Sequence, residues 1–325
     1  MSIKTVLSFV LRYALIFVLF SVFFVAGSGA VAGKMPAGAS EPGLVSDGVG
    51  LLIMVAVETL VLTALILTSR WGGWKLAILL SLAYYGAVTF LMQIETWYFL
   101  SNITVSPDLL PALFIMRIPV SFVVIPLAVW ILGKGKTQTD NKPNHALVMP
   151  IRQWVWKSAL IAAAYVTLYW SAGYFIAWQN PELRAFYGQP GEALPFWTHT
   201  LNTYHNDPGL LPFQILRAML WMVCALPIIR GSKVNLWWTA LLVGAMFGLP
   251  QNIGHIISNP LLPIASMRLS HMIETTSSTF VFGMIVAWLL HREHKSIKDL
   301  FGLDINRDEN GTTSGQPISS PRVTF

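Results

Sequence analysis

Stretches of about twenty apolar residues recur along the chain and are separated by short polar connections. A bilayer core needs about 20 apolar residues in helical form for one crossing. Stretches of that length lie near residues 6–27, 49–69, 76–100, 110–133, 154–178, 210–229, 235–258 and 263–290. The pattern therefore predicts an all-α fold, a polytopic membrane helix bundle with about eight transmembrane helices.

The connections between these stretches alternate in charge. The second, fourth and sixth connections and the C-terminal end hold most of the basic residues, namely Arg70, Lys75, Lys134, Lys136, Lys142, Arg152, Lys157, Arg230, Lys233, Arg292, Lys295 and Lys298. Cytoplasmic loops of membrane proteins are enriched in Lys and Arg. We therefore expect both termini in the cytoplasm and the odd-numbered connections outside. The short loops favour a bacterial-type inner (plasma) membrane.

The first apolar stretch allows a second interpretation. A basic start, an apolar run and the small residues Ala30, Val31 and Ala32 also fit a cleavable signal peptide. The repeat described next requires this helix and favours its retention. At the other end, the sequence from Asp304 onward is polar and rich in Gly, Ser and Pro, so we expect it to be disordered.

The two halves of the chain share several short patterns. "SPDLLPALFIMRI" at 106–118 and "NPLLPIASMRL" at 259–269 have the Pro, the Leu-Leu-Pro and the Met-Arg in common. Arg70 and Arg230 are as far apart in sequence as Glu95 and His255. These matches predict a parallel 4+4 internal duplication. The units would be residues 1–137, a cytoplasmic linker at 138–152, a second repeat at 153–291 and a cytoplasmic tail at 292–325.

The composition agrees with a membrane protein. The chain is 54% hydrophobic and 11% charged, whereas soluble domains carry roughly 25% charged residues. The net charge of +6 is explained by the basic connections, so we expect membrane lipids as partners and no nucleic acid. The single cysteine, Cys224, lies within an apolar stretch and is expected to be a core residue.

Ionisable residues within the spans are the candidates for function, because each costs roughly 2.5–3.5 kcal/mol at the centre of a membrane helix. On the expected topology, eight of them fall in the outer half of the bilayer or near its midplane. They are Glu58, Glu95, Arg117, Arg217, His255, Arg268, His271 and Glu274. Arg268, His271 and Glu274 share one helix face, and Asn252, His255 and Asn259 form a similar stripe. We predict that they line an outward-facing polar cavity.

The residue types suggest roles within this cavity. Glu58, Glu95, His255, His271 and Glu274 are candidate catalytic residues, since buried carboxylates and histidines perform acid–base chemistry. Arg117, Arg217 and Arg268 are candidate substrate-binding residues for an anionic group such as a lipid phosphate.

A divalent metal is one candidate cofactor of such a cavity. His255, His271, Glu274 and Glu95 supply imidazole and carboxylate groups of the types that bind metals in helix bundles. The HExxH motif of zinc proteases is absent from the sequence. The metal prediction therefore rests on residue types alone.

Other interpretations remain open at this point. Three carboxylates and three arginines would also form interhelical ion pairs that only hold the bundle together, although buried pairs stabilise weakly. The polar residues would also suit a proton-coupled small-molecule transporter or a structural or sensory subunit of a complex. The long aromatic connection at 179–208 would act as a lid or docking surface. The leading hypothesis is a membrane enzyme or ligand-binding protein for an anionic or lipid-like small-molecule substrate that arrives from outside.

Overall fold

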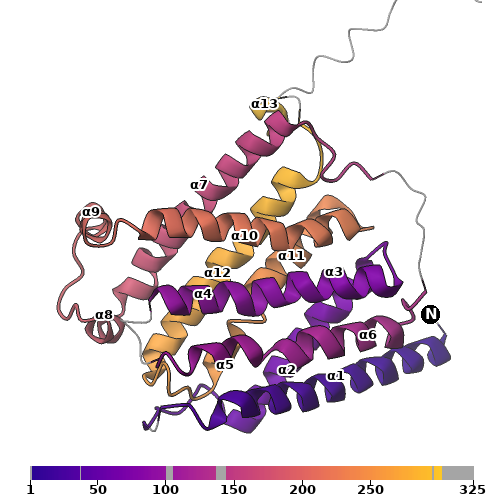
Figure 1. Cartoon of the computed structure of the whole chain (residues 1–325), viewed down its shortest axis with the longest axis horizontal. Coiled ribbons are helices and arrows are strands. Elements are labelled where there is room, and N and C mark those ends of the chain that lie inside the picture. The colour runs from indigo at the N-terminus through magenta and orange to yellow at the C-terminus, as the bar shows by residue number, and fades with distance from the viewer. Residues whose placement is uncertain (1, 37, 100–104, 137–143, 295, 302–325) are drawn as a thin grey trace, which may run out of the picture.

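The protein is a bundle of long helices (Figure 1). The computed structural model describes residues 2–36, 38–99, 105–136, 144–294 and 296–301. By length and composition, seven helices in these ranges can cross a membrane: Ile3–Ala32, Asp47–Thr68, Gly73–Tyr98, Leu110–Ile131, Ile151–Gln179, Leu210–Gly231 and Ala265–Leu290. No β-strand occurs in the described ranges. The predicted all-α membrane bundle is confirmed.

Some spans are single α-helices and others are composite. The uninterrupted ones are α1 (Ile3–Ala32), α2 (Asp47–Thr68), α7 (Ile151–Phe175), α10 (Leu210–Gly231) and α12 (Ala265–Leu290). One composite span joins α3 (Gly73–Tyr85), the π-helical turn η1 (Gly86–Phe90) and α4 (Leu91–Tyr98). Another joins α5 (Leu110–Ile115), the π-helical turn η3 (Val120–Val124) and α6 (Ile125–Ile131). A short 3-10 helix, η4 (Ala177–Gln179), extends α7.

The π-helical turns coincide with local constraints in the sequence. Pro119 directly precedes η3 and has no backbone N–H to donate, which interrupts the α-helical hydrogen bonds. Gly86 opens η1, and a Cβ at this position would lie 2.5 Å from Sγ of Cys224 on α10. Glycine therefore allows α3 and α10 to approach closely at this turn.

The expected span at 235–258 differs from the prediction. Only α11 (Leu236–Gly248) is α-helical, and its 13 residues reach about 20 Å, less than the roughly 30 Å of a bilayer core. Pro250 prevents continuation of the helix. The chain then forms the 3-10 helix η5 (Ile253–Ile256). The expected helical stripe of Asn252, His255 and Asn259 is therefore wrong.

The pair formed by α11 and α12 is packed through glycines. A Cβ at Gly283 would lie 2.8 Å from Cα of Gly244, and one at Gly248 would lie 2.9 Å from the carbonyl oxygen of Thr276. Small residues let membrane helices bring their backbones together. This contact fixes η5, which follows α11, against the first half of α12.

The helix ends gather at two ends of the bundle. Lys134 after α6 donates to the carbonyl of Ser69 after α2, at 2.6 Å. The N–H of Leu147 donates to the carbonyl of Leu290 at the end of α12, at 3.1 Å. Because the first turns of α1 border Leu67 of α2, both ends of the described chain emerge at this same end. We call it the basic end, and the opposite one, where α12 begins, the site end.

The turns after α2 and α10 pair with each other at the basic end. Ser69 and Ser232 form an antiparallel bridge, and the N–H of Arg70 donates to the carbonyl of Gly231 at 2.7 Å. The two turns occupy equivalent positions in the proposed repeat. An antiparallel bridge between them is consistent with a local two-fold axis at this contact. The duplication and its boundaries stay a prediction.

The terminal segments correspond in part to the sequence expectations. α1 places Ile16 and Phe20 in the core, where both are fully buried. A short helix, α13 (Ile297–Leu300), follows α12. The expected disordered tail from Asp304, and residues 138–143 of the expected linker, lie outside the described residues.

A buried histidine at the basic end predicts a pH dependence of stability. His294 is 2% exposed, and burial, together with Lys157 and Arg292, lowers its pKa to about 4. An unfolded histidine has a pKa of about 6.5. The unfolded state therefore binds more protons between these two values, and folding stability decreases as pH falls through this range.

We expect the melting temperature of the detergent-solubilised protein to fall between pH 7.5 and pH 5, and His294→Asn to reduce this fall. His205→Asn, at an exposed histidine on the far side of the molecule, serves as the control and should keep the wild-type pH dependence. An equal fall in wild type and His294→Asn would contradict the assignment.

Candidate functional site

The structure sorts the eight candidate ionisable residues into separate groups. Glu58 and Arg117 form a buried ion pair with 2.5 Å between Oε2 and Nη1. The hydroxyl of Tyr84 donates to the same carboxylate oxygen at 2.6 Å. Glu58 is fully buried and Arg117 is 8% exposed, with its guanidinium over the ring of Phe24. These residues join α2, α3 and the turn after α5.

Glu95 and Arg217 form a second ion pair, between α4 and α10. Nη1 and Nη2 of Arg217 donate to the two carboxylate oxygens of Glu95 at 2.5 and 2.6 Å, and Nη1 also donates to Oε1 of Gln214 at 3.0 Å. The Glu95 side chain is 25% exposed, whereas that of Arg217 is 2% exposed. Unlike Glu58, Glu95 is thus accessible from one side.

His271 and Glu274 form a third group on α12. Nδ1 of His271 lies 3.1 Å from Oε2 of Glu274, and the two side chains are 22% and 9% exposed. A carboxylate that accepts the Nδ1 proton fixes the tautomer and leaves Nε2 as a free acceptor. Nε2 points toward the hydroxyl of Tyr187 at 3.5 Å, a long contact.

The second and third groups share one site. The guanidinium of Arg217, which holds Glu95, lies 5.8 Å from the ring centroid of Tyr165 on α7, and the rings of Tyr165 and Tyr169 are 6.4 Å apart. A Cβ at Gly173, one turn beyond Tyr169, would lie 3.9 Å from Oε1 of Glu274, so glycine leaves this carboxylate room beside α7. We call Glu95, Arg217, His255, His271 and Glu274 together the polar site.

His255 reaches the polar site from η5. Its ring stacks on that of His271, with centroids 6.3 Å apart and planes 23° from parallel. Nδ1 of His255 is buried and has no hydrogen-bond partner within the described part of the chain. Nearby, Thr275 of α12 donates to Oδ1 of Asn252 at 2.8 Å and ties η5 to α12. The break after α11 is what brings this second imidazole to the site.

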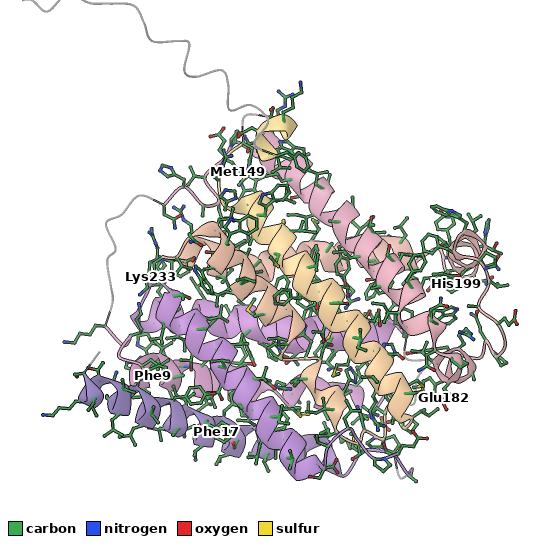
Figure 2. All side chains as sticks on the ribbon, turned by 180° about the vertical axis from the view of Figure 1, so that it is seen from behind. Phe9, Phe17, Met149, Glu182, His199 and Lys233 are labelled. Carbon is green, nitrogen blue, oxygen red and sulfur yellow. The ribbon has the colours of Figure 1, made fainter. Side chains whose placement is uncertain are left out.

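The connection at 179–208 covers the site end with two short helices, α8 (Pro181–Phe186) and α9 (Phe196–Asn206). Nδ2 of Asn180 donates to the hydroxyls of Ser266 and Ser270, and Ser266 donates to Glu182. Figure 2 shows Glu182 beside the first turns of α12 and His199 farther out on α9. These bonds hold α8 against α12 and place Tyr187 over His271.

Tyr187 remains a hydrogen-bond donor in this position. Burial raises the pKa of Tyr187, and the negative charges of Glu274 and Glu95 raise it further. Its hydroxyl is therefore protonated at physiological pH and faces the free nitrogen of His271.

α9 differs from α8 in having no buried residue. Trp197 is 73% exposed and Leu201 is 56% exposed, one turn apart. Tryptophan at this level is typical of the membrane–water interface. α9 thus presents exposed aromatic side chains, whereas Tyr187 at the end of α8 faces the polar site.

An aromatic layer lies between the polar site and the basic end. Trp221 is one turn beyond Arg217 on α10, and its ring lies 4.4 Å from that of Phe247. Phe282, two turns beyond Glu274 on α12, lies 4.8 Å from Tyr165 and 6.3 Å from Phe247. All four side chains are at most 4% exposed. The polar site therefore has a closed apolar floor.

Arg268 has a different environment from the one expected. It donates to the carbonyls of Glu41, Pro42, Leu262 and Pro263 and to the hydroxyl of Ser40. Of the three carboxylate–arginine pairs considered from the sequence, two are formed. The third carboxylate, Glu274, pairs with His271 and not with Arg268. Arg268 fastens the connection after α1 to the start of α12. Its expected binding of substrate stays a prediction, as does that of Arg117.

The metal site considered from the sequence stays a prediction, and the side-chain geometry adds no support to it. No group of three or more His, Cys, Asp or Glu side chains in the described ranges is placed to hold a metal ion. Both carboxylate oxygens of Glu95 accept from Arg217. The rings of His255 and His271 are nearly parallel, with centroids 6.3 Å apart.

Several residues that contact the candidate side chains were not predicted from the sequence. Tyr84, Tyr187 and Gln214 each contact a candidate ionisable side chain. Gln214 could have been predicted, because it precedes Arg217 by three residues and so shares its helix face. The two tyrosines could not have been singled out, since aromatic residues are frequent throughout this chain.

Comparison with known proteins adds no family assignment. No protein-family model matches the sequence, no curated protein is significantly similar to it, and no solved structure matches its fold. The protein is an integral membrane helical protein by its own helices.

Proposed function

We propose that the protein is a membrane enzyme that binds an anionic or lipid-like substrate at the polar site and uses His271 as a general base. The observation that carries the proposal is the pairing of His271 with Glu274, which leaves Nε2 directed at the hydroxyl of Tyr187. A histidine oriented by a carboxylate is the usual arrangement for removing a proton from a nucleophile.

The remaining polar groups support substrate binding. Arg217 holds Glu95 through two parallel hydrogen bonds, a geometry that also suits a phosphate or carboxylate group. Nε of Arg217 has no partner among the described residues. A substrate anion that replaces the accessible carboxylate of Glu95 would bind the guanidinium in the same manner and release Glu95 toward His271.

The aromatic floor favours an enzyme over a transporter. Transport by alternating access requires a site that opens to both sides of the membrane. Trp221, Phe247 and Phe282 pack directly beneath the polar site and fill the path to the basic end. Substrate would therefore enter from the site end or from the adjoining leaflet.

The proposal includes the orientation in the membrane. The basic residues of the turns after α2, α6 and α10 lie at the end of the bundle that carries both ends of the described chain. The positive-inside rule places that end in the cytoplasm. The polar site would then face the outer side of a bacterial-type inner membrane.

The test is lipid turnover by the full-length protein in nanodiscs made from a bacterial polar-lipid extract, followed by mass spectrometry of the lipids. We expect the wild type to convert one lipid class over time. His271→Gln should slow this conversion about 10²–10⁴-fold, the usual contribution of a general base. Glu274→Gln should slow it less, because the imidazole remains but loses its orientation.

His205→Gln is the matched control, because His205 is exposed on α9 and contacts the carbonyl of Leu201 four residues earlier. It should retain wild-type turnover. The melting temperature of each variant separates loss of chemistry from loss of folding. The proposal would be wrong if folded wild type left every lipid class unchanged, or if His271→Gln and the wild type converted lipid at equal rates.

A further inference from the structure

A groove of about 480 Å³ opens at the basic end, on the opposite side of the bundle from the polar site. It lies between the first turns of α1 and the ends of α2 and α6. Its polar side chains are Lys4, Thr5, Ser8 and Arg12, and its apolar ones are Phe9, Leu67 and Leu132. Figure 2 shows Phe9 near the N-terminal end of α1, at the edge of the bundle that also carries Lys233. The volume is within the range of ligand pockets.

Three of these polar side chains form one line along α1. Lys4, Ser8 and Arg12 are spaced by four residues, so they lie above one another on a single helix face. Nη1 of Arg12 lies beside Gly133, where a Cβ would come within 3.2 Å of it. Since α6 ends at Ile131, the guanidinium of Arg12 lies at the level where the helices leave the membrane. Arg12 thus extends its apolar stem along the bundle and keeps its charge at the interface.

The two cations are not neutralised within the protein. The lining contains no acidic side chain. Neither Lys4 nor Arg12 makes a side-chain hydrogen bond or ion pair within residues 2–36 or with the rest of the described chain. Both side chains are exposed. The groove is therefore electropositive at its rim.

The apolar half of the groove determines what kind of anion fits. Phe9, Leu67 and Leu132 form apolar walls beside the cations. A free phosphate would use the cations and leave these walls in contact with water. An anionic phospholipid satisfies both parts, because its phosphate meets the cations and its acyl chains cover the apolar walls.

We propose that this groove binds one anionic phospholipid of the leaflet at the basic end. The phosphate lies between Lys4 and Arg12, with the hydroxyl of Ser8 as a donor, and the upper acyl carbons pack against Phe9, Leu67 and Leu132. The site is independent of the polar site and of the chemistry proposed there.

The experiment is native mass spectrometry of the full-length protein in detergent, titrated with phosphatidylglycerol and, separately, with zwitterionic phosphatidylcholine. The double variant Lys4→Gln/Arg12→Gln is compared with Arg152→Gln/Lys233→Gln. The control pair also removes one lysine and one arginine, both exposed at the basic end and outside the groove.

We expect wild type and the control pair to retain one tightly bound phosphatidylglycerol in preference to phosphatidylcholine. Lys4→Gln/Arg12→Gln should bind it about twenty-five-fold more weakly, from about a five-fold loss for each cation removed near a membrane surface. Equal losses in the two double variants would overturn the proposal, because they would indicate general attraction to a basic surface. Displacement of the lipid by millimolar inorganic phosphate would also overturn it, in favour of a free-anion site.

Discussion

Glu58→Ala is expected to destabilise the folded protein by about 3–5 kcal/mol, the usual cost of removing one partner from a buried ion pair. The substitution leaves Arg117 with a charge in an apolar environment, 8% exposed, and removes the acceptor of the Tyr84 hydroxyl. Arg117→Ala should have a loss of similar size. The measurement is the free energy of unfolding in mixed detergent micelles, followed by circular dichroism.

The pair offers a sharper test than either single variant. Removal of both charged groups in Glu58→Ala/Arg117→Ala should cost clearly less than the two single losses together, because no unpaired charge remains. Arg292→Ala at the exposed pair with Asp299 is the control and should cost less than about 1 kcal/mol. Additive losses in the double variant would show that Glu58 and Arg117 do not act as a unit.

This result would distinguish an inaccessible ion pair with a structural role from a partly accessible pair that can take part in function. Glu58 and Arg117 are sealed together with Tyr84, so their exchange with a substrate would require the helices to open. Glu95 is paired just as closely with Arg217, yet a quarter of its side chain is accessible. The accessible pair belongs to the proposed site, and the sealed pair holds α2 to the turn after α5.

The sequence was sufficient for the fold class and for most of the spans. Long apolar stretches require no knowledge of partners, because the bilayer alone dictates helices of that length. The exception was the stretch at 235–258, where apolar composition continued past Pro250 although the helix did not. Proline in an apolar run is ambiguous in sequence, since membrane helices tolerate it when neighbours satisfy the freed carbonyls.

The partners of the charged residues were much less predictable. Equal numbers of carboxylates and arginines suggested pairs, and two pairs formed. Arg268 and Glu274 did not pair, although they share a helix. Arg268 is at the start of α12, where the carbonyls of two connections converge on it. Such carbonyl groups are present in every sequence and leave no pattern, so only the folded chain reveals this environment.

The arrangement of the polar site depends on the contact between α11 and α12. His255 lies on η5, beyond the end of α11, and His271 lies on α12. Their ring contact persists only if the two helices keep their separation. Glycines set that separation, so a residue far from the chemistry controls the geometry of the proposed catalytic histidine.

Gly283→Ala tests this dependence. The added Cβ would lie 2.8–2.9 Å from backbone atoms of Val243 and Gly244, and backbone cannot move aside as a flexible side chain can. We expect α11 and α12 to separate and the free energy of unfolding to fall by about 1–3 kcal/mol, the usual cost of overpacking. Turnover at the polar site should fall as well, because η5 and its histidine move with α11.

Gly29→Ala on α1 is the matched control, since a Cβ there meets nothing within 4 Å. Alanine favours a helix over glycine by about 1 kcal/mol, so this variant should be neutral or slightly more stable. The two substitutions add the same methyl group to a helix, and only their surroundings differ. If Gly283→Ala behaved like Gly29→Ala in both stability and turnover, close approach of α11 and α12 would not be what positions His255 against His271.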